Sequence, residues 1–293
     1  MDTSLTFTKM HGCGNDYIFL NDFSSNTTNS LKFIGDLHSN MKNLADLAIK
    51  LSNRNTSIGA DGLVFIMPSE IADAKMRMFN ADGSEGLMCG NSIRCVGKYL
   101  FDNKIVSSLQ MSIETLSGIR KLELILEAGS ISAARVDMGP AELLPEEIPV
   151  NLTGSRVVAR KVDILPYEIT CLSMGNPHAV IFNDDIAHFD LHTIGPMFEA
   201  SELFPQGVNL AVVQMISRTK MHMRAWERGT GETMASGTSA CAAAVAAVLM
   251  GYSDKNVDTQ VYVKGGILTV KYTDETVYMT GDCRISYEGV VKI

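Results

Sequence analysis

Two segments of the chain have hydrophobic patterns that predict helices. In the first, apolar residues recur at spacings of three and four, as on the buried face of an amphipathic helix; they are Ile93, Val96, Gly97, Leu100 and Phe101. In the second, nearly every residue from 240 to 250 is apolar, so this helix should be buried on all its faces. Polar residues that can cap a helix precede both segments, Asn91 with Ser92 and Thr238 with Ser239.

Strand-like patterns surround both helices. Segments 76–80 and 221–226 lead into glycine-rich turns, Leu122, Leu124 and Leu126 occupy alternate positions, and segment 261–272 is similarly strand-like. The order of these segments predicts an α/β (α+β) fold in which mainly antiparallel sheets wrap around the helices.

The two helical segments belong to an internal repeat. KMRMFNADGSEGLMCGNSIRC aligns with HMRAWERGTGETMASGTSAC at a constant offset of 147 residues. The pairs are Met76/Met223, Arg77/Arg224, Glu85/Glu232, Cys89/Ser236, Gly90/Gly237 and Ser92/Ser239. Because the offset is half of the 293 residues, we expect two pseudo-symmetric lobes. The first lobe is expected to comprise residues 1–130, and residues 281–293 are a candidate segment for returning to it. The second lobe, residues 131–280, is expected to be a structural repeat of the first.

Composition and charge exclude several classes of protein. Hydrophobic residues make up 46% and charged residues 20%, as in folded proteins, and a net charge of −8 leaves no basic surface for nucleic acid or anionic lipid. The longest apolar run, 240–250, is shorter than the roughly 18 residues that span a bilayer, and the first ten residues lack the apolar core of a signal peptide. Six scattered cysteines indicate free thiols in a reducing compartment. We therefore expect a cytoplasmic protein without nucleic-acid or membrane partners.

Cys89 and Ser236 occupy equivalent positions directly before the two helices. A helix N-terminus offers unpaired backbone N–H groups and a positive dipole end, which bind a carboxylate and stabilise a thiolate. If the lobes face each other across a cleft, two side chains approach one ligand from opposite sides. This arrangement suits removal of a proton from one face of a carbon and its return to the other, as in racemisation or epimerisation by general acid–base catalysis.

Other polar residues have structural as well as functional interpretations. His178, in GNPH, is either a satisfied loop histidine or a base that partners a thiol. Asn209 interrupts the apolar run GVNLAVV, so it is either a hydrogen-bonded core amide or a ligand contact. Turn formation is the default interpretation for three further asparagines, Asn15, Asn80 and Asn176.

No motif predicts a metal ion or a nucleotide cofactor. Cys89 and Cys95 lack the spacing of a zinc knuckle, HGCGNDY lacks the third glycine of a dinucleotide loop, and GxxxxGK[ST] is absent from the sequence. The sequence therefore indicates neither a metal site nor a nucleotide-cofactor site.

Six blocks in order, KMHGCGNDY, GADGLVF, FNADGSEGLMCGN, SMGNPHAV, GVNLAVV and ERGTGETMASGTSAC, resemble the diaminopimelate epimerases. These are cofactor-independent enzymes of lysine and peptidoglycan-precursor synthesis, with two pseudo-symmetric α/β lobes around a cleft. The resemblance implies that Cys89 is one of two catalytic thiols, and that His178 and Glu227 assist proton transfer, His178 with Cys89 and Glu227 on the other lobe. It implies substrate contacts from Asn15, Asn80, Asn176, Asn209 and Arg228, a carboxylate cradle of Gly90, Asn91, Gly237 and Thr238, and a homodimer.

One position departs from the family pattern. Ser236 stands where the family has its second catalytic cysteine, and serine is a far weaker acid and a poor base without an activating group. Three explanations remain open: an engineered serine, a natural variant in which Glu227 supplies the proton through the serine or a water, or a protein that performs chemistry on one face only.

The expected reaction is therefore the interconversion of LL- and meso-diaminopimelate, impaired by Ser236. The alternatives are a racemase of another amino acid such as histidine, a catalytically silent amino-acid-binding protein and, more weakly, a Cys–His hydrolase built on Cys89 and His178.

Overall fold

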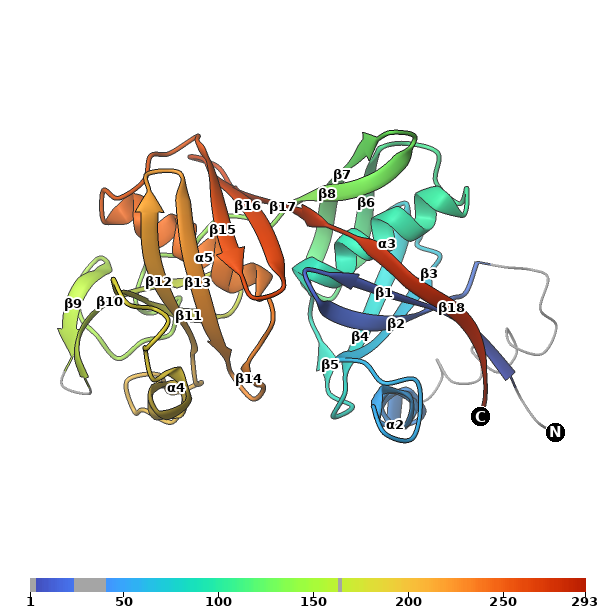
Figure 1. Ribbon diagram of the computed structural model, residues 1–293, viewed down its shortest axis with the longest axis horizontal. Helices are drawn as coiled ribbons and strands as arrows, with labels where there is room; N and C mark the ends of the chain where they lie inside the picture. The colour runs from blue at the N-terminus through green and yellow to red at the C-terminus, as the bar shows by residue number, and fades with distance from the viewer. Residues whose placement is uncertain (1–3, 24–40, 163–164) are drawn as a thin grey trace. The chain divides into compact units, whose positions relative to one another are not determined.

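A computed structural model describes residues 4–23, 41–162 and 165–293 (Figure 1). The chain divides into two compact units, which we call unit 1 and unit 2. Unit 1 comprises the described residues up to Val136 together with Asp282–Ile293, and unit 2 comprises Asp137–Gly281.

Unit 1 is a mixed sheet with two described helices. Its elements are β1 (Ser4–Gly12), β2 (Asn15–Asn21), α2 (Met41–Ser52), β3 (Gly62–Met67), β4 (Ala74–Asn80), β5 (Glu85–Gly86), α3 (Gly90–Asp102), β6 (Gln110–Thr115), β7 (Gly118–Glu127), β8 (Ser130–Asp137) and β18 (Arg284–Lys292). The pairs β2–β3 and β4–β6 are parallel, whereas β1–β2, β3–β4, β4–β5, β6–β7 and β7–β8 are antiparallel. The C-terminal strand β18 runs antiparallel along β1, so the first and the last described strands lie side by side (Figure 1).

Unit 2 repeats these pairings in the same order. Its elements are β9 (Val157–Val162), β10 (Leu165–Ser173), β11 (Pro177–Phe182), α4 (Leu191–Glu199), β12 (Asn209–Ser217), β13 (Lys220–Glu227), β14 (Gly231–Glu232), α5 (Gly237–Leu249), β15 (Asp258–Val263), β16 (Gly266–Tyr272) and β17 (Val277–Asp282). Here β11–β12 and β13–β15 are parallel, and β10–β11, β12–β13, β13–β14, β15–β16 and β16–β17 are antiparallel. The predicted fold, two equivalent units with mainly antiparallel sheets around a helix, is confirmed.

The helices α3 and α5 begin earlier than their sequences predict. Their N-caps are Cys89 and Ser236, both with extended backbone, and the carbonyl oxygens of these residues accept the first helical bonds, each 3.0 Å long. The prediction that residues 91–92 and 238–239 form the caps is wrong, because each helix starts at the glycine that pattern reasoning assigns to the turn. Cys89 and Ser236 are therefore the last residues outside the two helices.

Burial of α5 agrees with its composition. Alanine and valine side chains cover its faces, and every residue from 239 to 247 is buried. Small side chains let the surrounding strands approach the helix closely. A helix that is apolar on all its faces can therefore be enclosed by a sheet that wraps around it. Segment 261–272, predicted as strand, is a hairpin of β15 and β16, with its turn at residues 264–265.

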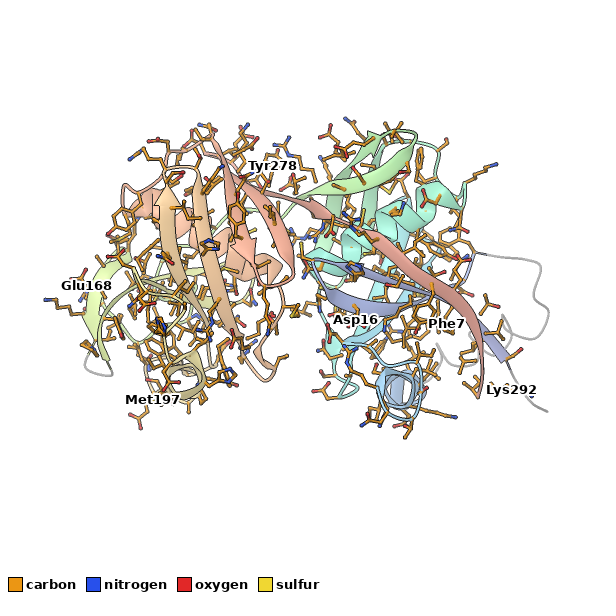
Figure 2. All side chains as sticks on the ribbon, in the orientation of Figure 1. Phe7, Asp16, Glu168, Met197, Tyr278 and Lys292 are labelled. Carbon is orange, nitrogen blue, oxygen red and sulfur yellow. The ribbon has the colours of Figure 1, made fainter. Side chains whose placement is uncertain are left out.

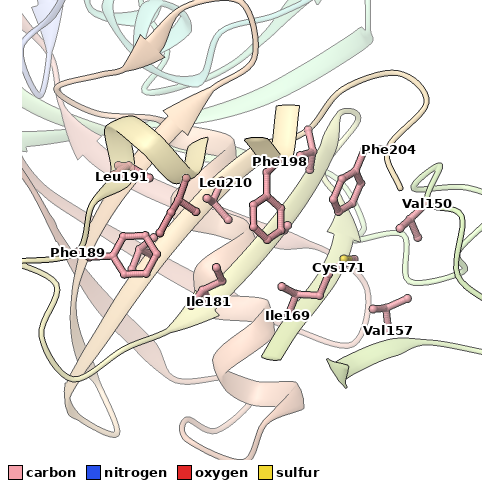
Figure 3. Close-up of a cluster of buried hydrophobic side chains, with 14 of the residues drawn as sticks. Val150, Val157, Ile169, Cys171, Ile181, Phe189, Leu191, Phe198, Phe204 and Leu210 are labelled. Atoms are coloured by element: carbon pink, nitrogen blue, oxygen red, sulfur yellow. The ribbon is translucent and has the colours of Figure 1, made fainter. Parts of the chain in front are cut away.

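A cluster of buried hydrophobic side chains packs α4 against the sheet of unit 2 (Figure 3). Phe198 of α4 lies over the strands that carry Ile181 and Leu210, and its ring centroid is 6.1 Å from that of Phe204. His178 is the second residue of β11 and Asn209 is the first residue of β12, so this packing supports the strands that carry the candidate site of unit 2.

Among the residues that the structure describes, no helix is both long and apolar enough to cross a membrane.

Candidate active site

Cys89 lies between the short strand β5 and α3, at one edge of the sheet of unit 1. Its Sγ donates to Oδ1 of Asn15, the first residue of β2, over 3.6 Å. Its side chain does not cap the helix, which leaves the thiol free to point away from the backbone. Cys89 is half-buried, whereas the other five cysteines are buried. It is therefore the thiol that solution can reach.

A hydrogen-bond network lies beside this thiol. Asn91, in the first turn of α3, donates from Nδ2 to Oδ1 of Asn15 at 3.1 Å. Arg94, which is fully buried, donates to Oδ1 of Asn91 at 3.0 Å and to the carbonyl oxygen of Gly90 at 2.9 Å. On the other side, Nδ2 of Asn15 donates to Oδ2 of Asp61 at 2.7 Å. Asn15, Asn91 and Cys89, which the sequence singles out, are thus in direct contact.

Asn80 ends β4 at the same edge of the sheet. It is the register partner of Gly62, the residue after Asp61, but its side chain donates to Oγ of Ser84 at 3.0 Å within its own turn. The side chain of Asn80 therefore stabilises its own turn, as its sequence predicts. The backbone of Asn80 nevertheless lies beside the hydrogen-bond network around Cys89.

In unit 2, Ser236 takes the place of Cys89. Its Oγ accepts a hydrogen bond from the backbone N–H of Ser239 at 3.4 Å, and its side chain is buried. The hydroxyl of Ser239 lies 3.4 Å from Nδ1 of His178. Ser236 and His178 are therefore joined through one residue of the first turn of α5.

His178 is held neutral by its surroundings. Its side chain is fully buried, and this burial, together with the positive charge of Arg228, lowers its pKa from 6.5 to about 3. Its Nε2 lies 2.9 Å from Oδ1 of Asn176. Because an amide oxygen only accepts, Nε2 carries the proton, and Nδ1 accepts from the hydroxyl of Ser239. His178 can therefore take up a proton, but only as a weak base.

Asn209 and Arg228 lie at the same edge as His178. Asn209 is the register partner of His178; its Nδ2 donates to the carbonyl oxygen of Pro177 at 2.9 Å and its Oδ1 accepts from the backbone N–H of Arg228 at 3.0 Å. The guanidinium of Arg228 donates to the carbonyl oxygen of Gln206 at 2.5 Å. Of the two interpretations of Asn209, the hydrogen-bonded core amide describes these contacts.

Glu227, which corresponds to Asn80 at the offset of 147, ends β13. Its Oε1 accepts from the hydroxyl of Thr233 at 2.6 Å. The first turn of α5 begins with Gly237 and Thr238, the first buried and the second half-buried. Their backbone N–H groups belong to the end of a helix where a carboxylate binds favourably.

The candidate catalytic residues are divided between the units. Cys89 belongs to unit 1, and Ser236, His178 and Glu227 belong to unit 2. The pairing of Cys89 with His178 therefore joins residues of different units and stays a prediction.

Pattern reasoning misses two residues of these networks, Asp61 and Arg94, and identifies Ser239 only as a helix cap and a repeat position. Asp61 was visible only as a carboxylate directly before a buried strand, and Arg94 as a cation in a helix of buried residues. Ser239 is visible as a polar residue in the first turn, but its contact with His178 depends on a strand 61 residues away.

Among the described residues, no three histidine, cysteine, aspartate or glutamate side chains are grouped so that they could hold a metal ion.

Comparison with known proteins gives consistent matches over nearly the whole chain. The sequence model of the family described as "Diaminopimelate epimerase" matches residues 7–144 and 170–286. A diaminopimelate epimerase from a Geobacillus species is 46% identical over 289 residues, covering 97% of this chain and 98% of the relative. One from Desulfovibrio desulfuricans is 47% identical over 299 residues, covering 99% of each chain.

Solved structures share the fold at low sequence identity. A phenazine biosynthesis protein of the PhzF family from Bacillus anthracis superposes with a TM-score of 0.69 at 16% identity, covering 99% of this chain and all of that chain. A hydroxyproline epimerase from Agrobacterium vitis has a TM-score of 0.67 at 12% identity, covering 99% and 91% of the two chains. At such identities the likeness concerns the fold alone.

Proposed function

The chain belongs to the diaminopimelate epimerase family, and from this premise we propose that it interconverts LL- and meso-diaminopimelate without a cofactor. The enzyme is an isomerase of amino acids. The observation that carries the mechanism is that Cys89 and Ser236 are the N-caps of equivalent helices in the two units.

The proposed reaction moves one proton off the α-carbon and another proton onto its opposite face. A base takes the α-hydrogen, the electron pair of the broken C–H bond delocalises into the carboxylate, and an acid returns a proton to the same carbon. Cys89 serves one face, and Ser236 or a water serves the other. The helix ends at Gly90, Asn91, Gly237 and Thr238 hold the carboxylate where negative charge develops.

The remaining assignments follow the family resemblance. Asn15, Asn80, Asn176 and Asn209 hold the substrate, and Arg228 binds a carboxylate. His178 and Glu227 assist proton transfer. The edge positions of these residues in their own units support this assignment, since the first residues of two parallel strands and the last residue of the next strand share one edge.

We propose that the step on the Ser236 side is slow. A serine hydroxyl is a poor acid–base group at neutral pH, and its Oγ already accepts from the N–H of Ser239. Glu227 is the carboxylate of unit 2 that could supply the proton through Ser236 or a water. The same serine supports a second candidate function, a protein that binds the amino acid without turning it over. A third candidate, a racemase of another amino acid, rests on the fold alone.

The protein is proposed to act as a cytoplasmic homodimer in lysine biosynthesis. Its six cysteines are free thiols, as expected in a reducing compartment. Ile285, Tyr287 and Val290 of β18 are 40%, 48% and 67% exposed. Apolar side chains exposed on a strand are typical of a surface that pairs with a second copy.

The test is incubation with LL-diaminopimelate in heavy water. The proposal expects meso product with solvent deuterium at the α-carbon. Exchange without inversion would restrict the chemistry to one face, and binding with neither exchange nor inversion would leave a silent binding protein. In Cys89→Ala, exchange should be abolished, whereas Cys283→Ala, which removes a buried thiol, should retain it; undiminished exchange in Cys89→Ala would remove Cys89 from the mechanism.

A further inference from the structure

The amide of Asn15 lies between a carboxylate and a thiol. Its Nδ2 is 2.7 Å from Oδ2 of Asp61, and its Oδ1 is 3.6 Å from Sγ of Cys89. Because an aspartate carboxylate only accepts hydrogen bonds, the group of Asn15 that faces Asp61 must be the N–H₂ group. The carbonyl oxygen is then the group that faces Cys89.

Two donors besides Asn15 hold the carboxylate of Asp61 in place. Nη2 of Arg54 donates to its Oδ1 at 2.8 Å, and the backbone N–H of Asp16 donates to its Oδ2 at 3.1 Å. Arg54 also donates to both carboxylate oxygens of Asp16, the residue labelled on β2 in Figure 2. Burial alone would raise the pKa of Asp16, yet hydrogen bonds from Arg54 and Lys9 hold it below its ordinary value. Asp16 therefore stays an anion and helps to anchor Arg54 beside Asp61.

A second set of contacts fixes Asn15 independently. Arg94 can only donate, so its 3.0 Å bond requires Oδ1 of Asn91 on that side. Nδ2 of Asn91 must then point away from Arg94, and it donates to Oδ1 of Asn15 at 3.1 Å. Arg94 at one end of this series of hydrogen bonds and Asp61 at the other therefore both require the same orientation of the amides of Asn91 and Asn15.

Unit 2 lacks this arrangement. At the offset of 147, Arg94 corresponds to Cys241 and Asn91 corresponds to Thr238. The residue beside α5 is instead the neutral His178. The two helix ends are therefore chemically different, although they occupy equivalent positions.

We propose that Asp61 is a positioning residue that fixes the amide of Asn15 so that its carbonyl oxygen, and not its N–H, faces the thiol of Cys89. A carbonyl oxygen can accept from S–H but cannot donate to a thiolate. This contact favours the protonated sulfur, so that in one direction of the reaction Cys89 donates a proton while the group of unit 2 removes the other; in the reverse direction the resulting thiolate of Cys89 removes the proton. The assignment of these roles rests on the proposed function, but the geometry of Asp61, Asn15 and Cys89 can be tested without substrate.

The experiment measures the alkylation of Cys89 by iodoacetamide, followed by mass spectrometry of the peptide that contains it. The thiolate is the form that reacts. Loss of a hydrogen bond that stabilises the thiol should therefore raise the rate in Asp61→Ala at neutral pH, by roughly two- to tenfold, the range of one net hydrogen bond. The ratio of the two rates should be larger at neutral than at alkaline pH.

A double-mutant cycle separates positioning from the loss of charge. Asn15→Ala should raise the rate as Asp61→Ala does, and combining the two should add nothing further. Asp73→Ala, which removes a carboxylate at the other end of β4, is the matched control and should leave the rate unchanged. Asp61→Asn, which retains an acceptor oxygen, should fall between the wild type and Asp61→Ala and serves if the alanine variant does not fold.

Two results would overturn the proposal. One is an unchanged rate in both folded Asp61 variants. The other is a full effect of Asp61→Ala in the Asn15→Ala background, which would show that the charge of Asp61 acts without Asn15. Since alkylation requires no substrate, these results do not depend on whether diaminopimelate is epimerised.

Discussion

Arg77 binds Glu85 through two parallel hydrogen bonds, from Nε to Oε1 at 2.7 Å and from Nη2 to Oε2 at 3.0 Å. Arg224 binds Glu232 in the same way, at 2.8 Å and 3.0 Å. The two ion pairs are related to each other by the repeat offset of 147 residues. Each one links a two-residue strand to the strand before it. The repeat therefore conserves an interaction as well as a pattern of residues, and this interaction shapes the turn that leads to Cys89 or Ser236.

The two ion pairs predict unequal losses of stability. Arg77→Met should lower the free energy of unfolding by about 1–3 kcal/mol, because a largely buried carboxylate loses its charged partner. Arg224→Met should lower it further, since Nη1 of Arg224 also donates to the carbonyl oxygens of Ile186 and Phe189. Urea unfolding of both variants measures the difference. An equal or smaller loss in Arg224→Met would show that these carbonyl contacts contribute nothing.

Ser236→Cys is expected to raise the rate of epimerisation. A thiol is a far better acid–base group than a serine hydroxyl, and one well-tuned group contributes on the order of 10²–10⁴-fold. The measurement is deuterium incorporation with inversion, compared with the unchanged chain. Ser217→Cys, which adds a thiol at the far end of β12, should leave the rate as it is. If Ser236→Cys brings no gain, the serine is not the missing proton-transfer group.

The burial of neutral His178 predicts that the free energy of unfolding falls at acidic pH. Its pKa is about 3 in the folded protein and about 6.5 when exposed, so the unfolded chain binds the proton more readily between these values. The contribution of neutral His178 to stability is therefore complete above about pH 6.5 and is lost progressively as the pH falls toward 3.

The check is the free energy of unfolding of the wild type and of His178→Gln as a function of pH. The wild type should lose more stability than the variant on acidification. His188→Gln removes a histidine whose side chain is 86% exposed, and it serves as the control. Parallel curves for the wild type and His178→Gln would contradict the predicted burial of a neutral imidazole.

Gly195 allows α4 to approach Trp226. A Cβ at this glycine would lie 2.4 Å from Cγ of Trp226, so Gly195→Ala must displace the helix or the ring. We expect a loss of about 1–3 kcal/mol in the free energy of unfolding, and lower activity because Trp226 directly precedes Glu227. Gly86→Ala meets only the flexible side chain of Met78, at 3.0 Å or more, and should cost less. Thermal unfolding of both variants tests the order.

Much of the fold was predictable because its signals are local. The spacing of apolar residues after Cys89 and the alanine-rich segment after Ser236 are properties of short stretches of chain, and each becomes a helix in the predicted place. The caps were missed because a glycine that starts a helix and a glycine in a turn look alike in sequence. The distinction depends on the carbonyl of the preceding residue, which only the folded backbone aligns with the helix.

The candidate site was less predictable because its contacts join residues that are far apart in the sequence. Asn15 and Asp61 are 46 residues apart, and the parallel pairing of β2 with β3 brings them together. No local pattern indicates which end of the Asn15 amide faces the thiol, nor that Arg94 is buried, since both depend on partners from other elements.

The sequence by itself determined the two helices, the offset of 147 that relates them, the placement of Cys89 and Ser236 before them, and the family to which the chain is similar. Such features are carried by residue order alone, because hydrophobic spacing and repeated motifs need no distant partner. Only the tertiary structure decided the neutrality of His178, the orientation of Asn15 and the partners of Arg94. Burial, hydrogen-bond direction and charge pairing arise when strands that are remote in sequence are brought into contact, and these contacts determine the chemical properties of the residues.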